Sequence, residues 1–389
     1  MTRPLDRPSA YPRTADPDAS WQQEVEGIDI VFGAGRLREL GAVAERVGGE
    51  RVLLVTDPGL VAAGHAVRAS RVLETQGFEV HRFDGVSPNP TTREVETGTV
   101  LARDKAIDLI VALGGGSAMD CAKGINFLLT NGGRMEHYWG FGKASKPMLP
   151  AIGIPTTAGT GSDAQSYALI SQLPSHRKMA CGDRKARFRT VLLDPDLLAT
   201  VPVRVAAAAG MDALSHALES FVTKARTPAS AALSREAFHL LEPVVEAVAH
   251  PPAAPESRSR ALLGSHLAGA GIEKSMLGGA HATANPLTSR HGVAHGDAIA
   301  LMLPSIIRFN GAAVGDLYSE LWPEGSDSLA SRIEEIRSRT GLPTSLTSIG
   351  LIPSDVKDLA EAAGDERTGQ FNPRPLNRAA FEEIYDDAL

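Results

Sequence analysis

The feature that most constrains the fold is a change of hydrophobic pattern near Pro202. From Glu24 to about Pro202, short apolar runs rich in β-branched residues alternate with stretches of helical periodicity, which is typical of βαβ units. The runs at residues 51–57 and 108–113 are largely apolar throughout, and 151–155 is a third candidate. Strands buried on both faces of a parallel sheet have this pattern. The first half is therefore predicted to be α/β with a parallel sheet.

Between these runs we expect a helix over residues 60–76, a strand over 79–83 and a helix over 92–105. After Pro202 the pattern becomes helical, as in the Ala-rich segments 205–222 and 227–248. A chain of 389 residues exceeds the size of about 250–300 residues at which a single core stops growing. We predict a flexible extension over residues 1–20, an α/β domain over 21–202 and a helical domain over 203–389, with a cleft between the two domains.

Composition and charge exclude several classes of partner. The net charge of -7 provides no basic field for nucleic acid. No stretch approaches about 20 uninterrupted apolar residues, so no membrane span is predicted. The first twenty residues lack the apolar run of a signal peptide. Cys121 and Cys181 do not have disulfide-framework or CxxC spacing, so two reduced thiols in a cytoplasmic protein are expected.

A glycine turn, residues 113–120, follows one predicted strand and opens a helix. Glycines at 114–116 would let the backbone approach a pyrophosphate, and the free N–H groups of the helix N-terminus would bind it. A purely structural alternative is a tight turn in which Ser117 and Asp120 form a capping pair. This motif alone does not decide between the two interpretations.

A second turn of small residues, 155–163, follows another predicted strand and presents hydroxyl groups to the same sheet edge. Ligands of open α/β sheets bind outside the carboxyl ends of the strands, where both turns should lie. Asp57 ends a further strand there, and its carboxylate could accept from ribose hydroxyls and repel a 2′-phosphate, which favours NAD over NADP. The structural alternative for Asp57 is a helix N-cap.

Metal-binding residue types cluster in the helical half. Asp212 and His216 are four residues apart, so a helix would place them on one face. His281 and His295 add two imidazoles from segments separated by a proline. Three imidazole nitrogens and one carboxylate suit Fe(II), Zn(II) or Co(II), but not Mg or Ca. Each histidine alone could be an ordinary hydrogen-bonded side chain, and the metal interpretation rests on the group as a whole.

These motifs together resemble the iron-containing (group III) alcohol dehydrogenase family over residues 27–389. The matching blocks include Ser87-Pro-Asn-Pro-Thr91, Gly114-Gly-Gly-Ser117, Ile154-Pro-Thr-Thr-Ala-Gly-Thr-Gly-Ser162, Gly210-Met-Asp-Ala-Leu-Ser-His216, Ala294-His-Gly296 and Asn372-Pro-Arg374. The resemblance implies a dehydroquinate synthase-like fold, with an N-terminal nucleotide-binding domain and a helical metal-binding domain. It also implies hydride exchange between NAD(P) and a small alcohol or aldehyde in the cleft.

By motif position, the resemblance implies the metal ligands Asp212, His216, His281 and His295. It implies nucleotide contacts by Asp57, Gly115, Gly116, Ser117, Asp120, Thr156, Thr157, Thr160 and Lys178. The family's last ligand stands nine residues after the proline of its histidine block, and Pro286 plus nine is His295 rather than His291.

One departure from the family pattern concerns catalysis. Many members carry a second histidine four residues after the third ligand, and this chain has Asn285 there. Asparagine can hydrogen-bond but cannot titrate. Proton exchange must then use His291, the cofactor ribose or water, unless the substrate differs. Asn285 and His291 are therefore the candidate catalytic residues.

The resemblance implies a metal that acts as a Lewis acid on the substrate oxygen, so zinc could replace iron. Two rivals are an NAD- and metal-dependent lyase of the dehydroquinate synthase type and a non-catalytic nucleotide-binding relative. The expected partners are a small alcohol or aldehyde and a second copy of the chain in a homo-oligomer, most simply a dimer.

Overall fold

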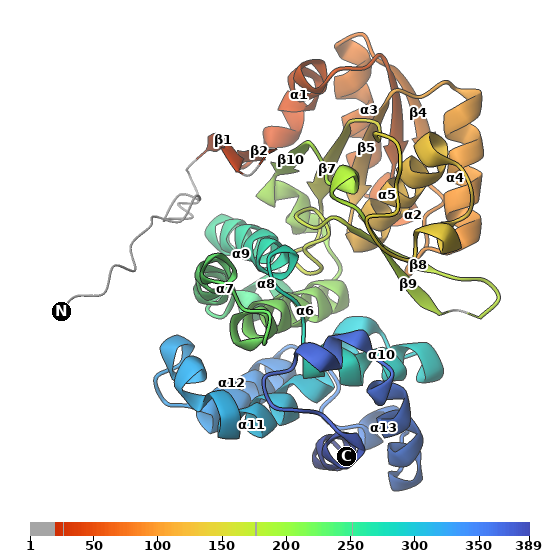
Figure 1. The fold of residues 1–389 in the computed structure, drawn as a ribbon. Helices are drawn as coiled ribbons and strands as arrows, with labels where there is room; N and C mark the ends of the chain where they lie inside the picture. Colours follow the sequence, from red (N-terminus) through yellow and green to blue (C-terminus); the bar gives the residue numbers. More distant parts are fainter. Residues whose placement is uncertain (1–19, 26, 176, 251) are drawn as a thin grey trace.

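The computed structural model describes residues 20–389 except 26, 176 and 251. The predicted N-terminal extension lies outside the described residues apart from Ser20. The chain forms an upper α/β part and a lower, wholly helical part (Figure 1).

A seven-stranded sheet, in the order β1-β2-β10-β7-β5-β3-β4, is the centre of the α/β part. All neighbouring strands in it are parallel except β1, which pairs antiparallel with β2. The predicted parallel sheet is thus confirmed, with one antiparallel edge strand. Its strands are β1 (Trp21–Val25), β2 (Ile28–Phe32), β3 (Arg51–Val55), β4 (Glu79–Phe83), β5 (Leu109–Gly114), β7 (Ala151–Pro155) and β10 (Thr190–Leu193).

Helices cover both faces of this sheet because its strands alternate their buried side chains between two cores. Val52 and Leu54 of β3 belong to a cluster with the helices α1 and α3, whereas Leu53 and Val55 belong to the cluster that includes α4 and α5. The second cluster continues into the helical part. The helices are α1 (Leu40–Val47), α2 (Pro58–Ala62), α3 (His65–Thr75), α4 (Thr92–Asp104) and α5 (Gly116–Asn131).

A small second sheet, in the order β6-β9-β8, extends toward the helical part (Figure 1). Strands β8 and β9 form an antiparallel pair that neither the motifs nor the hydrophobic pattern predicts. The strands are β6 (Gly140–Phe141), β8 (Tyr167–Ser171) and β9 (Lys178–Gly182).

Only helices follow β10 along the described chain, as the loss of β-branched runs predicts. They are α6 (Val203–Val222), α7 (Pro228–Leu241), α8 (Val245–Ala249), α9 (Pro255–Glu273), α10 (Gly279–His291), α11 (His295–Leu321), α12 (Ser326–Arg339), α13 (Val356–Gly364) and α14 (Arg378–Asp387). Helix α11 is long and apolar enough to cross a membrane, but 67% of its most apolar window is buried inside the fold. Packing against other helices accounts for that composition.

Short 3₁₀ helices complete the described chain. They are η1 (Arg36–Glu39), η2 (Met135–Tyr138), η3 (Arg184–Ala186), η4 (Pro195–Thr200), η5 (Thr347–Ile349), η6 (Pro353–Asp355) and η7 (Arg367–Phe371).

Two predicted helices are wrong in their extent. The segment 60–76 is broken into α2 and α3 at Gly64, whose φ of 80° ends the first helix. The segment 227–248 is likewise divided into α7 and α8.

Candidate active site

The metal-ligand candidates come from three helices of the lower part. Asp212 and His216 lie one turn apart on the buried helix α6. His281 lies in the first turn of α10, and His295 is the first residue of α11. Asp212, His216 and His281 are buried, whereas the His295 side chain is 23% exposed. Three residues therefore form an enclosed group, and His295 lies on its open side.

The separations from Asp212 to the three histidines fit ligands of one metal ion. His216 Nε2 lies 3.2 Å from His281 Nε2 and 3.3 Å from Asp212 Oδ1. Asp212 Oδ1 is also 3.6 Å from the Nε2 atoms of both His281 and His295. Metal–ligand bonds of about 2.0–2.2 Å place the atoms of a tetrahedral site about 3.3–3.6 Å apart. Asp212, His216 and His281 thus have the spacing of ligands around a common centre, and His295 has this spacing to Asp212.

Among the described residues, only Asp212, His216 and His281 form a group whose ligand atoms all lie within 4.8 Å of one another. His295, the last ligand of the predicted set, contacts Asp212 and therefore lies beside this group. Asp212 Oδ1 is buried and makes no hydrogen bond to any described residue. A buried carboxylate oxygen without such a partner fits a cation at this point.

The pKa values of most of the four ligand candidates favour the deprotonated forms that bind metal. Burial opposes the charge on Asp212, but the three histidines hold the pKa of its carboxyl well below its usual range. Burial lowers the pKa of His216, and it lowers that of His295 to about 3. Burial also disfavours charge on His281, but Glu219 and Asp212 raise its pKa to about 9. Without a metal, His281 therefore holds the proton that a metal would displace.

The glycine turn lies at the point where the strand order of the large sheet reverses. The chain passes from β3 to β4 on one side and then to β5 on the other side of β3. Asp57, just after β3, accepts a hydrogen bond from Leu60 N through Oδ1, so its predicted N-cap role is correct. A Cβ on Gly114 would lie 3.3 Å from Asp57 Oδ2, which places the second oxygen beside the glycine turn. The two roles considered for Asp57 are therefore compatible.

The predicted capping pair of Ser117 and Asp120 is wrong. Helix α5 begins at Gly116, and its N-cap, Gly115, has no side chain to cap the first turn. Ser117 Oγ instead accepts from Asn89 N at 3.3 Å, and Asp120 is buried one turn further on. Burial raises the pKa of Asp120 to about 6. The first N–H groups of α5 are thus left for an anion rather than for a side-chain cap.

The second small-residue turn packs directly against the first. A Cβ on Gly115 would approach Thr157 Oγ1 at 3.1 Å, and one on Gly116 would approach the Thr160 side chain at 2.7 Å. The residue after β7, Thr156, is buried, and its backbone N–H donates to Gly114 O at 3.1 Å. The two turns therefore form one continuous surface at the carboxyl edge of the sheet.

Lys123 is a residue of this region that the motifs did not reveal. Its side chain is buried on α5, and its Nζ donates to the carbonyl oxygens of Ser162, Gln165 and Tyr167 at 2.6, 2.6 and 2.9 Å. These bonds hold the second turn against the helix that begins at the first. The sequence signal was a lysine in a largely apolar helix.

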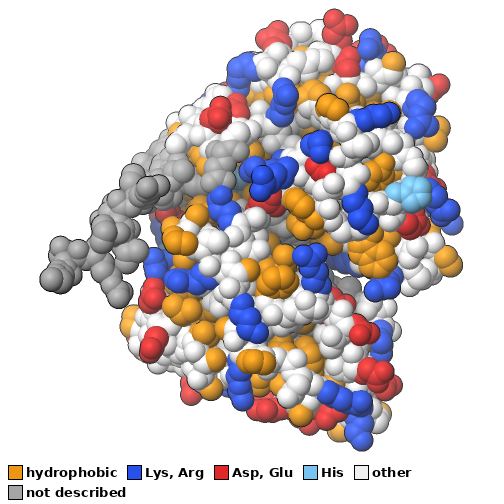
Figure 2. All heavy atoms as spheres, in the orientation of Figure 1, with side chains coloured by type: hydrophobic (Ala, Val, Ile, Leu, Met, Phe, Trp, Pro, Cys, Tyr) orange, Lys and Arg blue, Asp and Glu red, His pale blue; other side chains and the backbone are white. Residues whose placement is uncertain are grey.

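Lys178, at the start of β9, connects the two halves electrostatically. Burial lowers the pKa of its ammonium, while Asp120, Asp212 and Glu366 oppose this shift. Those three carboxyl groups come from the nucleotide turn, the metal group and the segment after α13. Lysine and arginine side chains are spread over the face of the molecule shown in Figure 2, with acidic side chains among them.

The structure separates the two candidate catalytic residues. Asn285 follows His281 by one turn of α10 and donates through Nδ2 to Glu366 Oε2 at 2.8 Å. His291 is exposed at the end of α10, ten residues beyond His281, which is about 15 Å along a helix. A role for His291 in proton exchange is therefore not supported. Glu366 is a neighbour of Asn285 that sequence reasoning missed.

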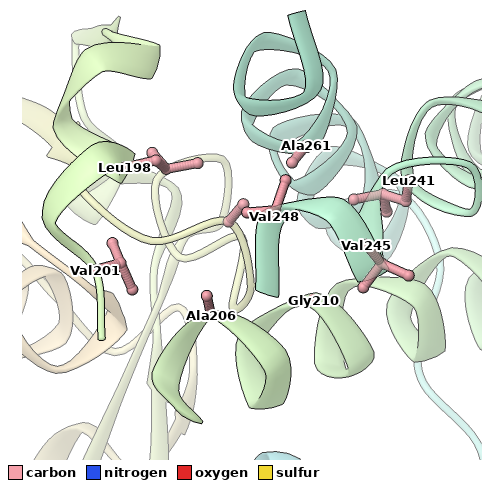
Figure 3. A pocket seen from close by; sticks show the side chains of 9 residues that line it. Leu198, Val201, Ala206, Gly210, Leu241, Val245, Val248 and Ala261 are labelled. Atoms are coloured by element: carbon pink, nitrogen blue, oxygen red, sulfur yellow. The ribbon is translucent and has the colours of Figure 1, made fainter. Parts of the chain in front are cut away.

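An apolar pocket lies beside this site, between η4, α6, α8 and α9 (Figure 3). It reaches Ala158 of the second turn and Gly210, two residues before Asp212, but every side chain that lines it is apolar. It therefore offers no group for acid–base or metal chemistry.

Comparison with known proteins identifies the family. Residues 28–195 match the family model described as iron-containing alcohol dehydrogenase, and residues 206–389 match that of the C-terminal part of the same family. Alcohol dehydrogenase 4 of Schizosaccharomyces pombe is 33% identical over 367 residues, which cover 92% of this chain and 87% of that protein. The NAD-dependent methanol dehydrogenase of Bacillus methanolicus is 30% identical over 372 residues, covering 92% and 97%.

Solved structures agree with this assignment. A 1,3-propanediol oxidoreductase matches with a TM-score of 0.89 at 29% identity, covering 95% of this chain and 99% of that one. Sulfoacetaldehyde reductase from Bifidobacterium kashiwanohense, solved with NAD+, matches with a TM-score of 0.86 at 27% identity, covering 95% and 98%. This chain is an oxidoreductase that belongs to the iron-containing alcohol dehydrogenase family.

Proposed function

We propose that this chain interconverts a small alcohol and its aldehyde with NAD, using one divalent metal held by Asp212, His216, His281 and His295. The observation that carries the proposal is the contact of Asp212 Oδ1 with three imidazole nitrogens at 3.3–3.6 Å. Lys178 interacts electrostatically with both Asp212 and Asp120, which lies beside the nucleotide turn. Iron(II) is the expected ion for this family, and zinc has compatible ligand chemistry.

On the nucleotide side, the backbone around Gly115 and Gly116 and the first turn of α5 would bind the pyrophosphate. Asp57 would accept from the ribose hydroxyls, which supports NAD over NADP because its charge repels a 2′-phosphate. The remaining proposed contacts line the same edge of the sheet. They are Ser117, Asp120, Thr156, Thr157, Thr160 and Lys178.

When bound, the metal would supply Lewis-acid polarisation of the substrate oxygen, and the nicotinamide would supply or accept the hydride. The chain's own contribution is to hold and orient these groups. Lys178 is within electrostatic reach of both Asp212 of the metal group and Asp120 beside the nucleotide turn. Asn285 can orient a polar group through hydrogen bonds but cannot exchange a proton itself. Proton exchange would then use the cofactor ribose or water rather than Asn285.

The domain division, oligomeric state and location are further parts of the proposal. The last strand of the large sheet ends at Leu193 and the first long helix begins at Val203, which supports domains over 21–202 and 203–389. Strand β1 lies at an edge of the sheet, where a second copy could pair, in support of a homodimer. The cysteines are unpaired and buried, as expected in the reducing cytoplasm.

The test is metal analysis of the purified protein combined with an NADH-consumption screen over small aldehydes, including anionic ones. The proposal expects about one divalent ion per chain and metal-dependent NADH consumption. Metal-replete protein that binds NAD tightly without turnover would favour the non-catalytic alternative. Turnover without net change in NADH would favour a lyase of the dehydroquinate synthase type.

A further inference from the structure

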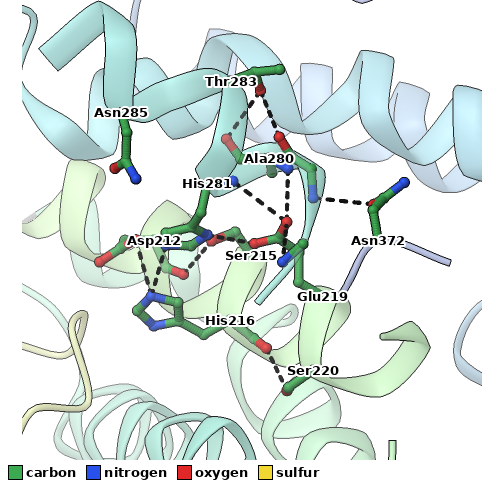
Figure 4. A network of polar contacts seen from close by, with 12 residues as sticks. Asp212, Ser215, His216, Glu219, Ser220, Ala280, His281, Thr283, Asn285 and Asn372 are labelled. Carbon is green, nitrogen blue, oxygen red and sulfur yellow. Dashed lines mark hydrogen bonds and ion pairs between the residues drawn. The ribbon is translucent and has the colours of Figure 1, made fainter. Parts of the chain in front are cut away.

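Glu219 is a buried carboxylate that no motif singled out, and it lies in direct contact with a metal-ligand candidate. It follows His216 by three residues on α6 and is 4% exposed. Asp212, His216 and Glu219 therefore share one face of this helix, at spacings of four and three residues. Figure 4 shows the Glu219 carboxylate between α6 and the start of α10.

The two oxygens of Glu219 have different partners. Oε1 accepts from the backbone N–H groups of Gly278, Ala280 and His281 at 3.1, 2.7 and 3.4 Å. Oε2 accepts from Nδ1 of His281. One carboxylate thus binds both the helix N-terminus that carries His281 and the imidazole of His281 itself.

The start of α10 is shaped to receive this carboxylate. Its N-cap, Gly278, has no side chain to cap the helix. A Cβ on Gly278 would lie 3.2 Å from Glu219 Oε1, so a larger residue would crowd the contact. Asn372 Oδ1 accepts from the N–H of Gly279 at 3.1 Å. The N–H groups that an isolated helix would leave without partners are therefore bonded to side chains from other segments.

The contact also determines which nitrogen of His281 is free. An imidazole that donates from Nδ1 to a carboxylate presents the lone pair of Nε2, and His281 Nε2 faces Asp212 and His216. We propose that Glu219 is a positioning residue for the metal site: it fixes the ring orientation and tautomer of His281 while it anchors the helix that carries this ligand. This inference rests on the proposed metal site.

Substituting glutamine should expose the double role. The glutamine side chain has one accepting oxygen and one donating NH₂ group, so it can accept from either the α10 backbone or His281 Nδ1, but not from both. The NH₂ group of the glutamine would then point at the remaining N–H group, and two donors cannot form a hydrogen bond. Loss of a hydrogen-bond partner to a metal ligand typically weakens metal affinity about 10- to 100-fold. We expect Glu219→Gln to weaken Zn(II) binding by about this factor.

The experiment measures Zn(II) dissociation constants of the full-length, metal-stripped protein by competition with a chelating indicator. Asn372→Ala is a matched variant, because it removes a cap of α10 without touching the His281 ring. Glu273→Gln is a second control, since this carboxylate accepts from Ser166 N and Oγ at 3.0 Å and lies outside the metal group. Both controls should bind Zn(II) within about threefold of wild type. Circular dichroism melts of the metal-free proteins report folding separately.

A folded Glu219→Gln protein with wild-type Zn(II) affinity would overturn the inference. If Asn372→Ala weakened Zn(II) binding as much as Glu219→Gln does, the role of Glu219 in orienting His281 would be overturned. Only a role in capping α10 would then remain. Should Glu219→Gln fail to fold, Glu219→Asp provides the comparison, since it keeps the charge but is too short by one methylene to reach both partners. Wild-type protein that binds no Zn(II) or Fe(II) would instead reject the proposed metal site.

Discussion

A methyl group at position 116 should weaken dinucleotide binding without disturbing the metal site. A Cβ on Gly116 would lie 2.7 Å from Oγ1 and Cγ2 of Thr160, about 0.8 Å inside the ordinary contact distance of about 3.5 Å. Overpacking of this kind costs about 1–3 kcal/mol. If the cost falls on the conformation that binds the cofactor, it corresponds to about a 5- to 150-fold loss of affinity. We expect Gly116→Ala to raise the Kd for NAD by this factor.

Calorimetric titration of NAD into the full-length protein measures this effect, with elemental analysis of the same sample. Gly364→Ala is a suitable control, because a Cβ there would meet no atom within 4 Å. The control should bind NAD as wild type does, and both variants should keep the wild-type metal content. A Gly116→Ala protein with NAD affinity within about threefold of wild type would refute the close packing of the two turns as part of the cofactor site.

Three further predictions concern cofactor choice, the fourth ligand and pH. Asp57→Gly should improve the use of NADPH relative to NADH in steady-state assays, because it removes a negative charge beside the 2′-phosphate; an unchanged ratio would reject that role. His295→Ala should lose most of its metal by elemental analysis, whereas His291→Ala should keep it, and the reverse result would require a different ligand set. Because His281 has a pKa of about 9 without metal, metal binding displaces about one proton near pH 7, so affinity should rise about tenfold per pH unit between pH 7 and 8 and fall as the pH drops. Affinity independent of pH over that range would contradict the protonation of His281.

Four strands of the large sheet, β3, β4, β5 and β7, were predicted from the sequence, whereas β1, β2 and β10 were not. Strands β4 and β7 coincide with the predicted segments 79–83 and 151–155. Strand β1 escaped prediction because its middle residues are exposed and polar, and its pairing with β2 is antiparallel. The pair β8–β9 was also missed, and it belongs to a separate three-stranded sheet.

The proposed ligands could be selected because a carboxylate and three histidines occur together in the helical half and match the family's motif positions. The supporting contacts could not, because they join residues far apart in the chain. Glu219 meets the start of α10 some sixty residues later, and Asn285 meets Glu366 across 81 residues. Such contacts depend on how the helices pack, which hydrophobic periodicity does not specify.

The reaction proposed for this chain is hydride exchange between an alcohol and NAD at the proposed metal group. The most direct measurement uses short primary alcohols deuterated at C1 with the protein loaded with Fe(II) or Zn(II), followed by mass spectrometry of the reduced cofactor. We predict deuterium at C4 of the nicotinamide with the loaded protein, and none with metal-stripped protein or with His216→Ala. Equal deuterium transfer in the metal-stripped protein, or loss of the deuterium to water, would contradict it.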